Sequence, residues 1–306
     1  MPTPYLALAL AGPHLLELTG DPALLARWDD LPVAFTVLGI DRIDASSPAA
    51  TTLDASSVGA ALAGRTARGR FLVAASPQRD HPYNLARRVA SLGHLSGGRS
   101  GVLLGTADAY APPGPEGAEA WGGAGLGVGA PLTEATAHDA GRAVRKLEQT
   151  WPYDAIVGDR AAKILVQSGR IVHADHEGAY SIAGPLNAPE PATGASVVGW
   201  LASASTVGPA AAPDPVFDLV LGPDGPVAVV PLGDELPDGV DGIVLRPSAD
   251  QSVAELLDTA TRLLADGLRP VEPGGPLRAA LGLAAAAPLP STSRAAFPVP
   301  QPQQSL

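Results

Sequence analysis

Short apolar runs recur along the chain, and helical patterns separate the early ones. Several of the runs are continuously apolar, which is typical of strands that are covered on both faces. The predicted strands are residues 5–11, 33–40, 70–76, 101–106, 196–203, 216–221, 227–232 and 240–245. The predicted helices between the early strands are residues 22–28, 56–67, 82–95 and 136–151. Alternating strands and helices predict a parallel sheet, and eight strands predict an α/β fold of the TIM-type (β/α)8 barrel class.

Two of the predicted helices carry start or stop signals. Leu85, Val89 and Leu92 form one apolar stripe, and a Gly-Gly pair at 97–98 ends that helix by permitting a left-handed backbone. In the later helix, Thr136 is followed three residues on by Asp139, which predicts a capping box at its start.

Two later segments predict β-hairpins. Residues 170–191 alternate around His176-Glu177-Gly178, which indicates a hairpin inserted between barrel elements. Residues 216–232 hold two strand-like runs joined by Pro223-Asp224-Gly225, and a parallel crossover needs roughly a dozen residues. An antiparallel pair is therefore predicted there. The sixth and seventh barrel strands are expected to be compressed or irregular.

Composition limits the function classes. The 306 residues are 46% hydrophobic, enough for one barrel domain over residues 1–283, while the proline-rich residues 284–306 predict a disordered tail. A net charge of −11 argues against nucleic acid or an anionic membrane as partner. The absence of cysteine excludes thiolate metal sites. With no basic leader and no long apolar run, a soluble cytoplasmic protein is expected.

Several motifs occur in an order that composition does not explain. They are PYNLAR at 82–87, ASLGHLSGGR at 90–99, GPLN at 184–187, DGIVLRP at 241–247 and LRAALGL at 277–283. In these motifs the chain resembles the bacterial luciferase-like flavin-dependent monooxygenases. The subgroup it resembles contains the nitrilotriacetate, EDTA and dibenzothiophene-sulfone monooxygenases and pristinamycin synthase. Gly93 stands where those relatives carry an acid.

The resemblance implies a reaction and its partners. Family members bind reduced FMN at the carboxyl ends of the barrel strands, form a flavin C4a-hydroperoxide and oxygenate an organic substrate. A separate flavin reductase supplies the reduced FMN. The same resemblance favours FMN over a deazaflavin, and a homo-oligomer or a hetero-oligomer with a homologue is expected.

The resemblance also implies cofactor-binding residues. Ser76, Thr106 and Ser203 match flavin-contacting positions, and an acid of the second strand corresponds to Asp41, with Ile40 as the alternative register. Arg79 is expected near the cleft, where its planar guanidinium would grip the flavin phosphate or an anionic substrate. No catalytic residue is assigned.

Other family positions differ in this chain. After the third strand, relatives read ATASTTYNEPYNLAR where this chain reads VAASPQRDHPYNLAR, and Leu103 replaces an asparagine. These departures favour an alternative, a degenerate paralogue that serves as a binding or regulatory subunit. Ser76, Thr106 and Ser203 around one cavity would favour catalysis, whereas Trp200 and Leu103 filling that cavity would favour the alternative.

Two further features have simpler interpretations. His173 and Asp175 share one face of a strand while His176 points away, so no metal site is predicted. The Gly-rich stretch 107–131 lacks the spacing of a phosphate-binding loop and is expected to cover the barrel mouth, with Trp121 as a lid residue.

Overall fold

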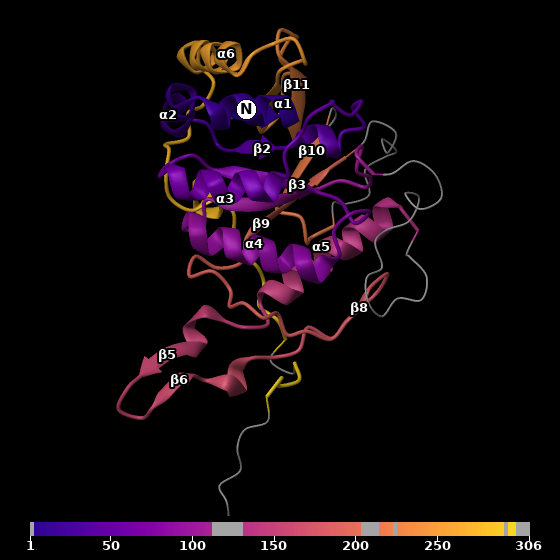
Figure 1. Ribbon diagram of the computed structural model, residues 1–306, viewed down its shortest axis with the longest axis vertical. Coiled ribbons are helices and arrows are strands. Elements are labelled where there is room, and N and C mark those ends of the chain that lie inside the picture. The colour runs from indigo at the N-terminus through magenta and orange to yellow at the C-terminus, as the bar shows by residue number, and fades with distance from the viewer. Residues whose placement is uncertain (1–2, 112–130, 203–213, 223–224, 291–292, 298–306) are drawn as a thin grey trace, which may run out of the picture.

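Eight parallel strands close into a barrel in the computed structural model of the chain (Figure 1). The structure describes residues 3–111, 131–202, 214–222, 225–290 and 293–297. Around the barrel the strands follow the order β1, β2, β3, β4, β9, β10, β11 and β12, which pairs with β1. All eight predicted strands are confirmed. They are β1 Tyr5–Leu10, β2 Thr36–Leu38, β3 Phe71–Ala75, β4 Ser100–Leu104, β9 Val197–Leu201, β10 Leu219–Gly222, β11 Val227–Pro231 and β12 Gly242–Arg246.

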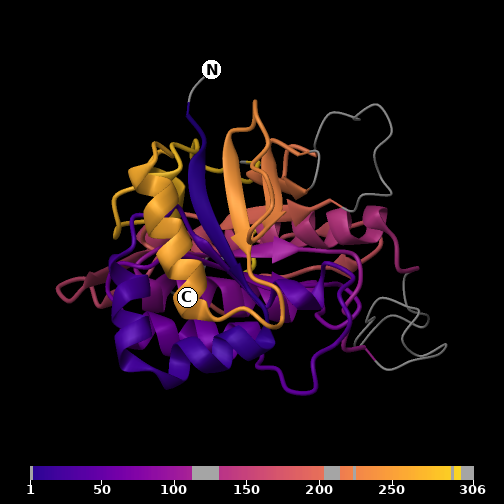
Figure 2. The same ribbon diagram turned by 90° about the horizontal axis from the view of Figure 1, so that it is seen from above.

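Helices cover the outside of the barrel. They are α1 Gly12–Gly20, α2 Pro22–Asp30, α3 Ala55–Arg65, α4 Pro82–Ser96, α5 Glu134–Glu148, α6 Val253–Ala265 and α7 Leu277–Ala280. The four predicted early helices are confirmed, whereas α1 and α6 were not predicted. Helix α6 packs against α1, α2 and β12 (Figure 2). No helix among the described residues has the length and apolar character needed to cross a membrane.

The predicted capping box of α5 is wrong. The helix begins one turn earlier, because Thr133 is its N-cap and its hydroxyl accepts a hydrogen bond from the Thr136 amide at 3.3 Å. Asp139 therefore lies inside the helix, where its carboxylate is buried and bonds other elements. The sequence was ambiguous here, because Thr133 and Thr136 have the same side chain and either can cap a helix.

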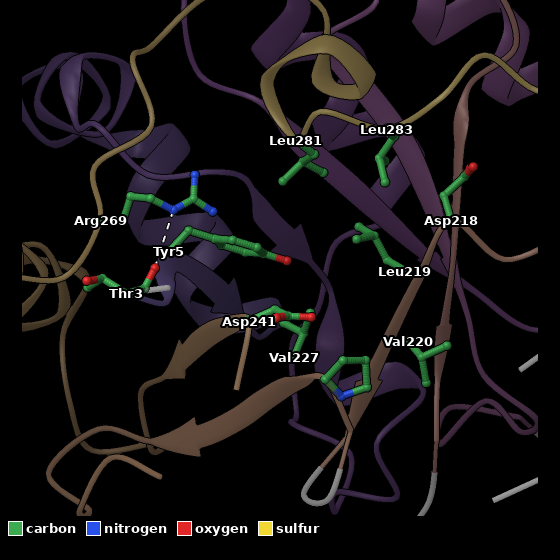
Figure 3. Close-up of a pocket in the computed structure, with 11 residues that line it drawn as sticks. Thr3, Tyr5, Asp218, Leu219, Val220, Val227, Asp241, Arg269, Leu281 and Leu283 are labelled. Carbon is green, nitrogen blue, oxygen red and sulfur yellow. Dashed lines mark hydrogen bonds between the residues drawn. The ribbon is translucent and has the colours of Figure 1, made fainter. Parts of the chain in front are cut away.

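Alternate strand residues fill the barrel interior. Tyr5, Ala7 and Ala9 of β1 belong to the inner cluster, as do Leu72 of β3 and Leu103 of β4. The intervening strand residues pack outward against the helices, as the two-residue period of a strand requires. The interior is thus a packed core, and a cavity of about 330 Å³ opens at its amino-terminal end (Figure 3).

The predicted antiparallel hairpin at 216–232 is also wrong. Strands β10 and β11 are parallel neighbours, paired through Leu221 with Val227 and Gly222 with Ala228. A crossover helix is needed when the chain must return to the start of the preceding strand. Here β11 begins beside the end of β10 and runs in the same direction, so no return to the start of β10 is needed. The sequence predicted an irregularity around the sixth and seventh strands. It is the offset of β11 from β10, which leaves only two residue pairs between them.

Two antiparallel hairpins are inserted between α5 and β9. The predicted hairpin is confirmed as β7 His176–Glu177 with β8 Ser181–Ile182, and the other, β5 Ile156–Asp159 with β6 Ile164–Val166, was not predicted. Figure 1 shows β5 and β6 projecting from the barrel. Part of the predicted tail lies against this insertion, where the Ala296 amide donates to the Ile171 carbonyl at 2.8 Å.

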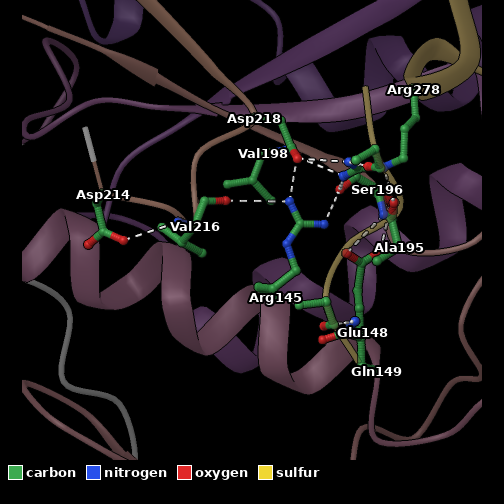
Figure 4. A network of polar contacts seen from close by, with 12 residues as sticks. Arg145, Glu148, Gln149, Ala195, Ser196, Val198, Asp214, Val216, Asp218 and Arg278 are labelled. Carbon is green, nitrogen blue, oxygen red and sulfur yellow. Dashed lines mark hydrogen bonds and ion pairs between the residues drawn. The ribbon is translucent and has the colours of Figure 1, made fainter. Parts of the chain in front are cut away.

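A partly buried polar network joins α5 to the amino-terminal ends of β9 and β10 (Figure 4). Asp218 pairs with Arg145 of α5 at 2.5 Å and with Arg278 of α7 at 2.7 Å. Glu148 is fully buried and accepts hydrogen bonds from the Ser196 hydroxyl at 2.7 Å and the Ser196 amide at 3.2 Å. Burial raises the pKa of Glu148 to about 7, although the Ser196 hydrogen bonds lower it.

This pKa predicts a pH-dependent stability. The folded pKa lies above the ordinary value of 4.5, so between about 4.5 and 7 the folded state binds more protons than the unfolded state. The free energy of unfolding should fall by roughly 2 kcal/mol as pH rises through that window. Urea unfolding at pH 5 and pH 8 measures the change. Glu148→Gln should remove most of it, and an equal pH dependence in the variant would contradict the assignment.

Candidate functional site

The carboxyl ends of the barrel strands form a polar mouth, the end at which barrel enzymes place their chemistry. The segment after β2 turns into this mouth at Gly39, whose φ of 76° is a left-handed conformation that favours glycine. Its amide donates to the Leu10 carbonyl of β1 at 2.8 Å. The short 3-10 helix η1, Ile40–Arg42, follows and carries Asp41 and Arg42 over the strand ends.

Asp41 joins three loops of the mouth. It is 3% exposed, and its carboxylate accepts hydrogen bonds from the Gly12 amide at 3.1 Å and from the Tyr110 hydroxyl at 2.5 Å. The same hydroxyl accepts a hydrogen bond from the Ala49 amide at 3.0 Å. Burial, and then the hydrogen bond to Asp41, raise the pKa of Tyr110, so its proton stays on the phenol oxygen.

A buried ion pair links the ends of β2 and β4. Arg42 Nη2 lies 2.7 Å from Asp108 Oδ2, and the two side chains are 5% and 3% exposed. The Arg42 guanidinium also lies 4.9 Å from the centre of the Tyr110 ring. The other Asp108 oxygen accepts a hydrogen bond from the Tyr110 amide at 2.9 Å. Buried charges persist only when they are paired and hydrogen-bonded in this way.

The segment after β3 places the Arg79 guanidinium near the Arg42–Asp108 ion pair. Ser76 is buried, and its hydroxyl accepts a hydrogen bond from the Gln78 amide at 3.2 Å, which fixes the turn after the strand. Gln78 Oε1 accepts from the Asp108 amide at 2.6 Å. Arg79 Nη1 lies 4.0 Å from Asp108 Oδ2, and its side chain is 49% exposed. Because Arg42 already neutralises Asp108, the Arg79 guanidinium retains capacity for another anion.

A second arginine reaches the mouth from β12. Arg246 continues the inward-facing positions Gly242 and Val244, and its guanidinium pairs with Asp44 and donates to the Ser46 hydroxyl. The Arg246 guanidinium is thus already paired with residues of the segment that follows β2. Of these two arginines, Arg79 is the more accessible to a ligand phosphate.

The structure brings together three of the five predicted cofactor-binding residues. Asp41, Ser76 and Arg79 belong to one network through Tyr110, Asp108 and Gln78. Thr106 is partly buried and lies two residues after the end of β4. Ser203 and Trp121 lie outside the described residues, as does most of the Gly-rich stretch.

The sequence interpretation missed Arg42, Asp108 and Tyr110. A signal existed, because charged residues directly after buried strand ends gather at one end of a barrel. The partner of each charge, however, is set by the path of the loop that follows the strand.

The two residues proposed to fill the mouth behave differently. Trp200 faces outward beneath α5, with its ring centre 4.7 Å from that of His138 and 5.7 Å from that of Phe217. Leu103 faces the barrel interior. Trp200 therefore does not fill the mouth, which removes one argument for the non-catalytic alternative.

The inserted hairpin packs on α5 through a buried dyad. His176 Nε2 lies 3.0 Å from Asp139 Oδ2, and the Tyr180 amide donates to the same oxygen at 3.2 Å. Burial alone would raise the pKa of Asp139, but these contacts lower it overall. Asp175 pairs instead with Arg294 at 2.8 Å. Across the described ranges, no group of three such side chains converges as metal ligands.

The donor set of the mouth suits the phosphate of a flavin mononucleotide. Arg79 offers a half-exposed, two-point donor, and the turn fixed by Ser76 holds it in place. Part of the mouth is filled, because a Cβ added to Gly105 would lie 2.6 Å from Ile43 Cβ. The Arg79 guanidinium could thus hold such a phosphate, whereas the space beside Gly105 is already occupied by Ile43.

Curated proteins resemble parts of this chain. A dibenzothiophene-sulfone monooxygenase of Rhodococcus erythropolis is 31% identical over 124 residues, which is 38% of this chain and 25% of that protein. One of the subunits of pristinamycin IIA synthase from Streptomyces pristinaespiralis is 32% identical over 163 residues, 53% of this chain and 48% of that protein. The chain thus spans between a quarter and about half of the length of these relatives. No family model matches it.

Solved structures share the fold. EDTA monooxygenase from Chelativorans sp. BNC1 superposes with a TM-score of 0.59 at 17% identity, covering 92% of this chain and 99% of that one. DmoA from Hyphomicrobium sulfonivorans superposes with a TM-score of 0.53 at 14% identity, covering 92% of both chains. These matches confirm the barrel fold that the sequence predicted.

The buried ion pair predicts the effect of removing one partner. Arg42→Met leaves the Asp108 carboxylate buried without its cation and should lower the free energy of unfolding by about 3 kcal/mol at pH 7. The double variant Arg42→Met with Asp108→Asn removes both charges and should recover much of that loss. Arg79→Met, at a half-exposed side chain, should change stability little. Urea unfolding measures all three, and equal losses in the single and double Arg42 variants would contradict the pairing.

Proposed function

From the relationship of this chain to the luciferase-like flavin-dependent monooxygenases, we propose that it binds reduced FMN at the barrel mouth and oxygenates a small organic substrate. The observation that carries the proposal is the accessible Arg79 guanidinium, held beside a neutralised buried ion pair at the carboxyl ends of the strands. The ordered family motifs and the shared fold support the same assignment.

The chain's residues would divide the work at this site. Arg79 would bind the flavin phosphate through two parallel hydrogen bonds, and the Ser76 turn would orient it. Thr106 would offer a hydroxyl to the flavin from the end of β4. The Tyr110 hydroxyl, which keeps its proton, would continue to donate to the Asp41 carboxylate and so satisfy that buried acceptor as water is excluded. When bound, reduced FMN would supply the two electrons that activate dioxygen, so that one oxygen atom of dioxygen would go to the substrate and the other would leave as water.

The partners follow from the same proposal. The family resemblance implies a separate flavin reductase, which would deliver reduced FMN to the mouth. Association with a second copy or a homologous subunit is proposed as well, since one relative is named as a subunit of its synthase.

Arg79→Gln separates phosphate binding from ring binding. In anaerobic titrations the variant should bind reduced FMN roughly 10-fold to 100-fold more weakly, because a charge-assisted hydrogen bond is lost. Its affinity for reduced riboflavin, which lacks the phosphate, should stay near that of the wild type. Arg27→Gln is the control, since Arg27 is an exposed arginine of α2 paired with Asp258.

The outcomes distinguish the two functions. Equal weakening for both flavins would place Arg79 away from the phosphate. Failure of the wild-type protein to bind reduced FMN at high micromolar concentration would contradict the monooxygenase proposal and favour a non-catalytic subunit.

A further inference from the structure

The cavity of about 330 Å³ lies at the amino-terminal end of the barrel, opposite the mouth (Figure 3). Tyr5 at the start of β1, Leu219 at the start of β10 and Val227 at the start of β11 line it. Leu281 and Leu283, after α7, form another side. Because its strand residues are the first or second of their strands, the cavity is separated from the proposed flavin site by the packed barrel interior.

The Tyr5 hydroxyl has no hydrogen-bond partner among the described residues. The Tyr5 side chain is 6% exposed, and its ring is fixed in place. The ring lies over Gly242, where an added Cβ would approach it to 2.4 Å, and its edge meets the Phe35 ring at a centroid distance of 6.2 Å. Figure 3 shows the hydroxyl pointing toward the cavity. A buried hydroxyl without a partner is unfavourable, so an acceptor placed in the cavity would satisfy it.

The surrounding charges decide which ligand atom suits the hydroxyl. Burial, and then the carboxylate of Asp241, raise the pKa of Tyr5, so the hydroxyl keeps its proton and acts as a donor. Asp218 is already neutralised by Arg145 and Arg278. The Arg269 guanidinium lies 5.4 Å from the Tyr5 ring centre, at the rim. With Asp218 neutralised, Asp241 and Arg269 leave one charge of each sign in the lining, which favours neither an anionic nor a cationic ligand.

We propose that this cavity binds a small neutral molecule with an apolar ring and a hydrogen-bond-accepting oxygen. The oxygen would accept from the Tyr5 hydroxyl, and the ring would pack against Leu219, Val227 and Leu281. The volume agrees, since small-molecule pockets begin near roughly 300 Å³ and a cavity of about 150 Å³ already holds benzene. The proposal stands apart from the flavin site.

The test pairs two probes with two forms of the protein. Acetophenone has the ring and the acceptor, and ethylbenzene has nearly the same shape without the acceptor. Binding is measured by ligand-observed NMR titration. Wild-type protein should prefer acetophenone over ethylbenzene by roughly fivefold, the effect of one neutral hydrogen bond. Tyr5→Phe should bind the two equally. Because this variant removes only an unpartnered hydroxyl, its melting temperature should not fall.

A filling variant tests the location. Leu283→Trp, at a partly buried wall position, should abolish binding of both probes while leaving reduced FMN titration unchanged. The proposal is overturned if wild-type protein shows no saturable binding at millimolar acetophenone, if Tyr5→Phe keeps the preference, or if Leu283→Trp binds as the wild type does. None of these results depends on whether the protein binds flavin.

Discussion

The stretch from β9 to β12 closes the barrel, and none of its described residues between 214 and 252 is helical. Closure there therefore depends on contacts between the strands and at their ends. Strands β10 and β11 share only two residue pairs, so hydrogen bonds between them hold the ring weakly. The partly buried carboxylate of Asp218 compensates at the amino-terminal end by pairing with Arg145 and Arg278. Those two arginines also donate to the Ser196 carbonyl at the start of β9. The same closure holds the carboxyl ends of the eight strands in a ring, and the proposed chemistry requires that ring.

At the mouth, paired charges organise loops that the barrel alone would leave apart. Asp41 and Asp108 each join segments that are more than sixty residues apart in sequence, through Tyr110 and Arg42. With Asp108 satisfied, Arg79 remains as the accessible cation. The proposed flavin function therefore rests on an arrangement in which most charges are structural and one is left for the ligand. Departure from the family motif after β3 is compatible with this arrangement, because Gln78 and Arg79 are themselves replacements.

The sequence predicts the strands well because buried parallel strands are continuous apolar runs whatever their neighbours. Its errors arise where the answer depends on distant packing. The turn signal at 223–225 is compatible with a hairpin or a sideways step, and only the stagger of β10 and β11 decides between them. The glycine at position 93, where relatives carry an acid, also depends on distant packing. A Cβ there would lie 2.6 Å from Pro191, a neighbour that no local sequence pattern reveals. For the candidate site, motif position predicts that Asp41, Ser76 and Arg79 lie near one another at the strand ends, but it does not predict their hydrogen-bond partners.

Amide hydrogen exchange with and without reduced FMN, under anaerobic conditions, tests the central claim most directly, because it locates the flavin at one end of the barrel. The account predicts slower exchange on binding at the mouth, in the turn after β3 and the segment from Thr106 to Tyr110, with no change around Tyr5 and Leu219. Protection confined to the amino-terminal cavity, or none at a saturating flavin concentration, would contradict it.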